Sequence, residues 1–148
     1  MTALRLDSNA SWRQQLLPTL AAGRQLAAFA LTEPDAGSNP IALRATAVRT
    51  EGGWRVSGEK QWIGLASWAG VTTVFAKAVD ASGGPLGITA PLVAEDTAGL
   101  SQGPEALTMG MRGMVQNTVY LNKAFVPDAS VLLAPGEGME VARDAMLF

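Results

Sequence analysis

The strongest constraint on the fold is a series of short apolar runs, each ended by glycine, proline or aspartate, from Gln25 onward. Glu51-Gly52-Gly53 is a tight hairpin signal, and Ser57-Gly58-Glu59-Lys60 is a second turn signal. Many short strands joined by glycine-rich turns favour an antiparallel barrel or sandwich over an α/β fold. We therefore predict an all-β, antiparallel barrel-like domain. Strands are expected near residues 26–32, 43–50, 53–57, 60–64, 71–79, 86–93 and 117–126.

Helical patterns flank these strands. Ser11 is expected to cap a helix that Pro18 stops, and Gly23 closes a second helical turn. From Glu137, apolar residues recur at helical spacing up to Phe148, which implies a fragment or a partner; the alternative is a short terminal helix packed on the barrel. The expected organisation is residues 1–24 as the end of a helical region with its lead-in, 25–135 as the β-domain and 136–148 as the start of a truncated helix.

Composition removes several classes of chemistry. The 148 residues include neither cysteine nor histidine, which excludes disulfides, cysteine-type zinc sites, thiol nucleophiles and histidine-based triads. We predict no metal site. The net charge of −2, without a dense basic patch, argues against a nucleic-acid partner.

The surface and location can also be predicted from composition. Charged residues make up only 16% of the chain, where about 25% is typical, so we expect another structure to cover part of the surface. The apolar stretch Leu16–Leu31 is interrupted by Pro18, Gly23 and Arg24, and it does not predict a membrane span. A cytoplasmic location is expected.

The segment Phe29–Pro40, "FALTEPDAGSNP", leaves an apolar run and enters a turn rich in small and hydroxyl residues. Gly37 permits a positive φ and close approach of another group, and Ser38 adds a hydroxyl donor. Successive N–H groups in such a turn can form a nest for an anion. From the residue types alone, an ordinary strand exit followed by an Asp-Ala-Gly-Ser turn is the favoured interpretation.

Four segments in order decide between these interpretations: Phe29–Pro40, "GGWRVSGEKQWIG" at 52–64, "LTMGMRG" at 107–113 and Val126-Pro127. Together they resemble the middle domain of the acyl-CoA dehydrogenase family. The resemblance implies an FAD enzyme that performs α,β-dehydrogenation of an acyl thioester such as acyl-CoA. It further implies helical domains before and after the β-domain, FAD between the β-domain and the C-terminal helices, a homo-oligomer when complete, and an electron-transfer acceptor.

The same resemblance implies roles for individual residues. Thr32 would meet the edge of the flavin ring, Trp62 would pack beside the ring, and Ser38 and Ser82 would lie toward the CoA end of the substrate. The base that removes the α-proton belongs to the C-terminal helical domain, so we assign no catalytic residue here and expect the isolated chain to be inactive. The complete set of expected cofactor contacts is Phe29, Leu31, Thr32, Gly37, Ser38, Trp62, Ile63 and Gly64.

The chain departs from the family at Gly64, where the family usually has a hydroxyl residue near the reactive nitrogen of the flavin. The side-chain hydrogen bond is therefore absent, although the Gly64 N–H could replace it. This leaves two alternatives to a dehydrogenase domain. One is a flavin- or acyl-CoA-binding module without dehydrogenase chemistry of its own, and the other is an interaction domain that has lost its ligand.

Overall fold

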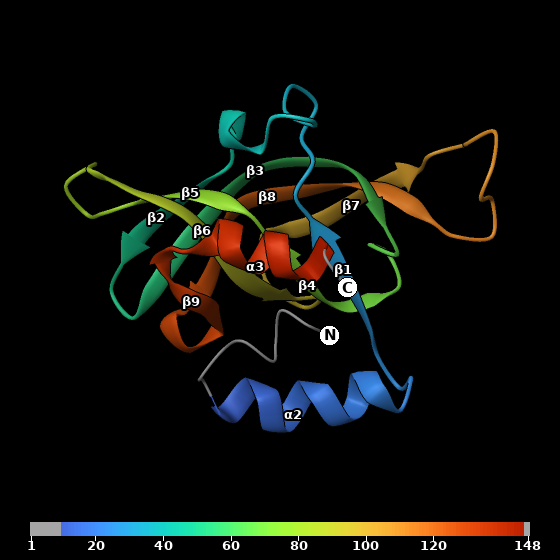
Figure 1. The fold of residues 1–148 in the computed structure, drawn as a ribbon, viewed down its shortest axis with the longest axis horizontal. Helices are drawn as coiled ribbons and strands as arrows, with labels where there is room; N and C mark the ends of the chain where they lie inside the picture. The colour runs from blue at the N-terminus through green and yellow to red at the C-terminus, as the bar shows by residue number, and fades with distance from the viewer. Residues whose placement is uncertain (1–9, 147–148) are drawn as a thin grey trace.

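The computed structural model describes residues 10–146, in which strands predominate and a helix lies at each end (Figure 1). The all-β prediction with flanking helices is confirmed. The helices are α2 (Ala10–Ala21) and α3 (Gly138–Met146), with 3-10 turns η1 (Pro40–Ala42) and η2 (Asp128–Ser130). The strands are β1 (Leu26–Ala30), β2 (Thr46–Thr50), β3 (Gly53–Gly64), β4 (Ala69–Val74), β5 (Ala76–Val79), β6 (Pro85–Ala94), β7 (Leu100–Glu105), β8 (Gln116–Pro127) and β9 (Val131–Gly136).

The strands form one mixed sheet in the order β1-β4-β6-β5-β2-β3-β8-β7, with β9 added to β6. Most neighbours are antiparallel, as predicted, but β1 pairs with β4 and β2 pairs with β5 in parallel. Within residues 10–146 the sheet curves without closing into a barrel. Parallel strands cannot be joined by a hairpin and need a crossover connection, so hairpins alone could not produce this order.

Strand β3 is continuous across residues where the sequence predicted a turn. Its register against β8 shifts between Val56 and Gly58, and the extra residue lies in β8, where Lys123 has a φ of 51°. A Cβ at Gly58 would lie 2.6 Å from the Cβ of Ala45. Gly58 is therefore required for close packing beside a bulge, and the interpretation of this glycine as a turn residue was wrong.

Two strands were missed and one predicted strand is divided. β7 is polar and contains Pro104, which is tolerated because β7 lies at the end of the strand order and pairs with β8. β9 is short, and its ladder pairing with β6 is at Ala90 and Pro91. The predicted strand 71–79 breaks at Phe75, whose N–H donates to Ala30 O at 3.2 Å as the chain passes from β4 to β5.

Two clusters of buried apolar side chains form the core. One is built around Trp54, Val56 and Ile63 of β3. The other includes Phe75, and α3 closes it by burying Val141 and Ala142. Figure 1 shows α3 lying across the strands, so the predicted terminal helical face is used within this domain from Gly138 onward.

Helix α2 continues through Pro18, which was wrongly predicted to end it. Proline removes one backbone donor, but the helix needs only one further turn before it ends. That end is as predicted: Gly23 has a φ of 66° and its N–H donates to Leu20 O, while the N–H of Arg24 donates to Thr19 O. Residues 1–9 and 147–148, which belong to the expected terminal regions, lie outside the described residues.

Asp128, which follows β8, binds the indole N–H of the buried Trp54. Its carboxylate accepts a hydrogen bond from Trp54 Nε1 at 3.0 Å and pairs with Arg49, whose Nη2 lies 2.9 Å from Oδ2. The Arg49 guanidinium lies 5.0 Å from the Trp54 ring centroid.

Replacing Asp128 should separate these two contributions. Asp128→Asn keeps an oxygen acceptor for Trp54 and loses an exposed ion pair, so unfolding free energy should fall by at most about 1 kcal/mol. Asp128→Ala leaves the indole N–H without its partner and should cost about 1–3 kcal/mol. Urea unfolding measures both values. Equal costs would mean that the Trp54 hydrogen bond contributes nothing.

Candidate functional site

The two segments that carry the main sequence motifs lie side by side. The backbone N–H of Gln61, in β3, donates to Thr32 O at 2.9 Å. Gln61 is free to do so because the register of β3 against β8 shifts between Lys60 and Ile63, with one extra residue in β3. This bulge therefore connects the end of the β1 segment to the exposed end of β3.

The same bulge turns Trp62 outward. Trp62 has a φ of 59°, and 55% of its surface is exposed, whereas Ile63 is buried in the core. A positive φ is rare and costly for a large side chain. The strand thus presents an indole at the surface in a conformation that core packing does not explain.

A buried ion pair joins the two segments below this surface. Lys60 Nζ lies 2.7 Å from Glu33 Oε1, and the side chains are 0% and 4% exposed. Lys60 Nζ also donates to Leu31 O at 3.2 Å. Glu33 further accepts the backbone N–H of Arg44 at 2.6 Å and of Ala45 at 3.0 Å.

These contacts determine the charge of the pair. Burial raises the pKa of Glu33, but the hydrogen bonds from Lys60, Arg44 and Ala45 outweigh it, and the pKa lies below the ordinary 4.5. Burial lowers the pKa of Lys60 below 10.5, and the neighbouring Glu33 carboxylate opposes that effect. Glu33 is thus a carboxylate at neutral pH, and its hydrogen-bonding capacity is used within the fold.

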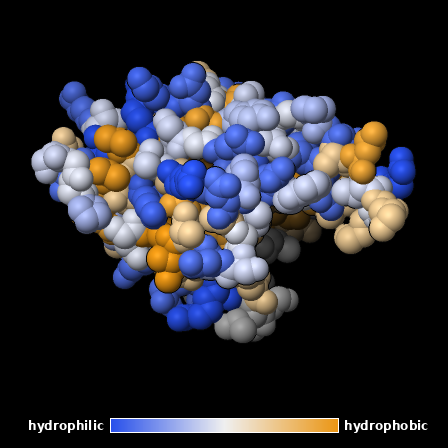
Figure 2. All heavy atoms as spheres, turned by 90° about the horizontal axis from the view of Figure 1, so that it is seen from above, coloured by the Kyte–Doolittle hydropathy of each residue, from blue (hydrophilic) through white to orange (hydrophobic). Residues whose placement is uncertain are grey.

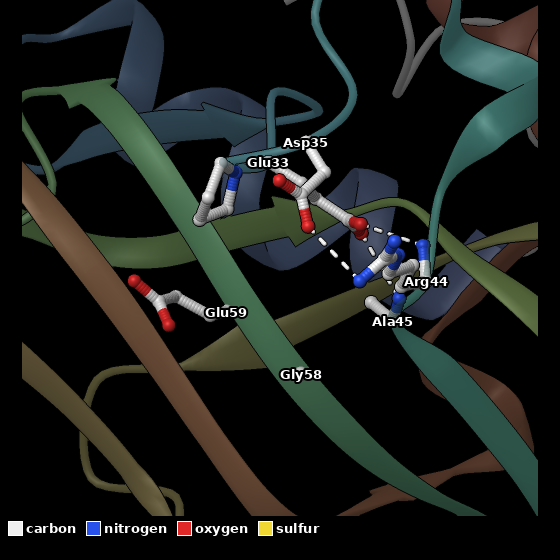
Figure 3. A pocket seen from close by; sticks show the side chains of 7 residues that line it. Glu33, Asp35, Arg44, Ala45, Gly58 and Glu59 are labelled. Carbon is white, nitrogen blue, oxygen red and sulfur yellow. Dashed lines mark hydrogen bonds and ion pairs between the residues drawn. The ribbon is translucent and has the colours of Figure 1, made fainter.

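Figure 3 shows the cavity above this pair, of about 230 Å³. On one side the Arg44 guanidinium contacts the exposed Asp35 carboxylate at 2.9 Å. Glu59, on β3, lies away from them across the opening. The cavity combines carboxylates and one arginine without a buried, unpaired polar side chain, and it does not by itself indicate a ligand. Its lining residues are Glu33, Pro34, Asp35, Arg44, Ala45, Gly58 and Glu59.

The remaining residues of the first motif lie on or near the surface. Phe29 is 36% exposed and its ring centroid lies 4.8 Å from that of Phe75, while Leu31 and Thr32 are half-buried. Gly37 and Ser38 are exposed. Gly37, whose lack of a side chain permits a positive φ, does not have one. A Cβ there would meet open space, so packing within the described chain does not require glycine.

Ser82 lies apart, in the β5–β6 hairpin. Its hydroxyl and its N–H both contact Asp80 Oδ1, at 2.7 and 2.8 Å, and Gly84 N–H donates to the same oxygen. These bonds hold the pKa of the exposed Asp80 below its ordinary 3.8. The structure therefore gives the Ser82 hydroxyl a role in closing its own turn.

The loop between β7 and β8 carries the third motif and projects from the body of the domain (Figure 1). Leu107, Met109 and Met111 are strongly exposed on it, and Figure 2 shows apolar atoms gathered at this end. At its base, Met114 approaches Gly64: a Cβ built on Gly64 would lie 3.3 Å from Met114 Cε. Gly64 does not have a positive φ.

The family model described as "Acyl-CoA dehydrogenase, middle domain" matches residues 28–124. The chain belongs to the acyl-CoA dehydrogenase family. The match covers most of the strands and both motif segments that meet at Gln61.

Individual relatives agree with this assignment. A probable acyl-CoA dehydrogenase of Bacillus subtilis is 39% identical over 88% of this chain and 21% of its own length. The structure of an acyl-CoA dehydrogenase from Bacillus anthracis, complexed with FAD, has a TM-score of 0.87 and 35% identity over 96% of this chain and 24% of that one. A glutaryl-CoA dehydrogenase from Mycobacterium smegmatis, in complex with FADH2, has a TM-score of 0.87 and 31% identity over 99% of this chain and 36% of that one. The chain thus spans about a fifth to a third of these relatives.

Sequence reasoning named the exposed residues of the two motif segments as candidates but missed two groups that lie beside them. Lys60 and Glu33 were seen only as parts of motifs, although a lysine and a glutamate beside apolar strand residues hint at a buried pair. Met114 carried no signal, because its approach to Gly64 depends on the path of the loop. Among residues 10–146, no group of acidic side chains could hold a metal ion, and no helix is long and apolar enough to cross a membrane.

The strained backbone at Trp62 can be tested by comparing two truncations. Trp62→Gly and Trp62→Ala remove the same exposed indole, but only glycine adopts a φ of 59° without strain. The glycine variant should be more stable by about 1 kcal/mol in urea unfolding. At Arg55, an exposed β3 residue without a positive φ, alanine should instead be the more stable. The same order at both positions would contradict a strained Trp62.

Proposed function

We propose that this chain binds FAD and forms one wall of the acyl thioester site of an FAD-dependent acyl-CoA dehydrogenase. The observation that carries the proposal is the bulge at Gln61 and Trp62, which exposes an indole directly after the residue whose N–H donates to Thr32 O. FAD carries a flat ring with a polar edge, and an exposed indole next to a strand end suits both parts. The FAD and FADH2 named for two solved relatives support the choice of cofactor.

The residues of this site fit FAD. Trp62 supplies flat apolar surface, and the Thr32 hydroxyl and the Gly64 N–H are candidates for the ring edge. The exposed Gly37 has open space where a Cβ would be, which leaves room for a phosphate to approach the backbone. Phe29, Leu31 and Ser38 complete the proposed side-chain contacts, whereas Ile63, whose side chain is buried in the core, would contribute only its backbone. Bound FAD would supply the acceptor for the hydride that leaves the substrate β-carbon.

The substrate and partners are part of the same proposal. Ser38 would lie toward the CoA end of an acyl thioester, whereas Ser82 is the weaker candidate because its hydroxyl is bonded to Asp80. The proton-removing base would come from helical domains that complete the enzyme, as the family resemblance implies. A homo-oligomer, an electron-transfer acceptor and a cytoplasmic location remain predictions.

The alternative of a binding module without dehydrogenase chemistry has less support. The curated relatives are named as dehydrogenases, including an isovaleryl-CoA dehydrogenase of Solanum tuberosum that is 34% identical over 87% of this chain. Activity of the chain after its helical domains are supplied, assayed with acyl-CoA substrates, distinguishes the two. Flavin binding without turnover would favour the module.

FAD titration of the chain, followed by flavin fluorescence, tests the cofactor assignment. Because only part of the expected pocket belongs to this chain, the dissociation constant should be micromolar or weaker. Trp62→Ala should weaken binding about tenfold, as expected for loss of one stacked contact. Trp68→Ala is the matched control, because Trp68 is also 55% exposed and lies outside the proposed contact set. Equal effects of both variants would count against Trp62 as a flavin contact.

The missing hydroxyl at residue 64 makes a further prediction. A threonine there can adopt the backbone, but its Cβ would lie 3.3 Å from Met114 Cε. Gly64→Thr combined with Met114→Ala should therefore place a donor beside reduced flavin. A hydrogen bond to a charged group, about 1.5–3 kcal/mol, would raise the midpoint potential by about 30–60 mV. Spectroelectrochemical titration measures it, with Met114→Ala alone as control, and an unchanged potential would place Gly64 away from the flavin.

A further inference from the structure

We propose that Glu33 and Lys60 are positioning residues, which set the relative position of Thr32 and Trp62 and thereby the affinity for flavin. This inference rests on the proposed function. It assigns to a buried ion pair a role in site geometry that is separate from its role in stability. Neither side chain reaches the surface, so neither is expected to touch the ligand.

The contacts bracket the two proposed flavin residues. Glu33 follows Thr32 directly, and Lys60 precedes Trp62 by two positions. The Lys60 ammonium bonds to Leu31 O and to the Glu33 carboxylate, one residue to either side of Thr32. The backbone N–H of Gln61 donates to the intervening residue, at Thr32 O. Three hydrogen bonds therefore join residues 31–33 to residues 60 and 61 of β3.

The Glu33 carboxylate also closes the loop that carries Gly37 and Ser38. It accepts N–H groups from Arg44 and Ala45, at the far end of that loop. At the near end, Glu33 and Ala36 exchange two backbone hydrogen bonds, at 2.9 and 3.2 Å. Glu33 thus holds the near end of the loop through its backbone and the far end through its carboxylate (Figure 3).

The use of a buried ion pair at this place favours a role in positioning the site over a role in stabilising the fold. A buried ion pair seldom stabilises a fold more than apolar side chains of similar size would. Apolar contacts, however, have no preferred direction, whereas the lysine and glutamate here each hold two or more partners at defined distances. Binding sites lose affinity when supporting groups let them relax by about 0.5 Å.

The test uses the double variant Lys60→Met with Glu33→Gln, which removes both charges and leaves no unpaired buried ion. Amide hydrogen exchange of Gln61 reports the strength of its hydrogen bond to Thr32 O without any ligand. The reference amide is Asn122, which donates to Gly99 O at 2.8 Å. FAD titration reports affinity. Asp128→Ala serves as a destabilised control far from the site.

The expected result is a folded double variant in which Gln61 exchanges at least about tenfold faster relative to Asn122, and in which FAD binds about tenfold more weakly. Asp128→Ala should change neither ratio. Unchanged Gln61 exchange, or FAD affinity within about twofold of the parent chain, overturns the proposal. If the parent chain binds no FAD, the cofactor assignment fails, and the exchange ratio alone decides whether the pair positions Thr32.

A second variant covers the case in which the double variant does not fold. Lys60→Arg keeps the positive charge, but its guanidinium is larger than an ammonium and directs its N–H groups within one plane, so the bonds to Leu31 O and Glu33 cannot keep their present geometry in this buried space. It should fold and shift the same two measurements in the same direction by several-fold. Parent-like exchange and affinity in a folded Lys60→Arg chain would overturn the proposal.

Discussion

The site depends on one extra residue in β3. Between Lys60 and Ile63, β3 contains one residue more than the facing part of β8. The extra residue cannot pair with β8, so the backbone bulges there. The displaced N–H of Gln61 finds Thr32 O, and the displaced side chain of Trp62 points outward. Two segments about thirty residues apart are joined by this irregularity, which a regular strand would not have allowed.

The buried ion pair complements the bulge. A lysine ammonium without a partner in the core would be costly, so Lys60 is tolerable only because Glu33 and Leu31 O receive it. The glutamate is equally dependent, since its ionised form is held by that ammonium and by two backbone N–H groups. The two charged motif residues Glu33 and Lys60 are thus buried and bonded within the fold. The exposed residues beside them are those available to a ligand.

Sequence periodicity predicted the all-β architecture and the approximate position of most strands, because alternating apolar residues and glycine-rich turns are local signals. It could not predict the parallel pairing of β1 with β4, which depends on partners more than forty residues apart. Gly58 and Gly37 illustrate the same limit. Both were interpreted through backbone freedom, but Gly58 accommodates Ala45, a contact set by tertiary packing. The resemblance supplied the proposed site residues, and the geometry added Lys60, Glu33 and Met114 as their neighbours.

The edge strand β7 has a consequence for association between chains. An open sheet with a free edge invites another strand to add to it. β7 ends in Gly103, Pro104 and Glu105, and proline offers no N–H while glutamate brings charge to the margin. Its register against β8 also shifts between Gln102 and Glu105, which bends the edge away from a straight template. The composition that hid β7 from sequence analysis is therefore the one that protects an unclosed sheet against strand-by-strand aggregation.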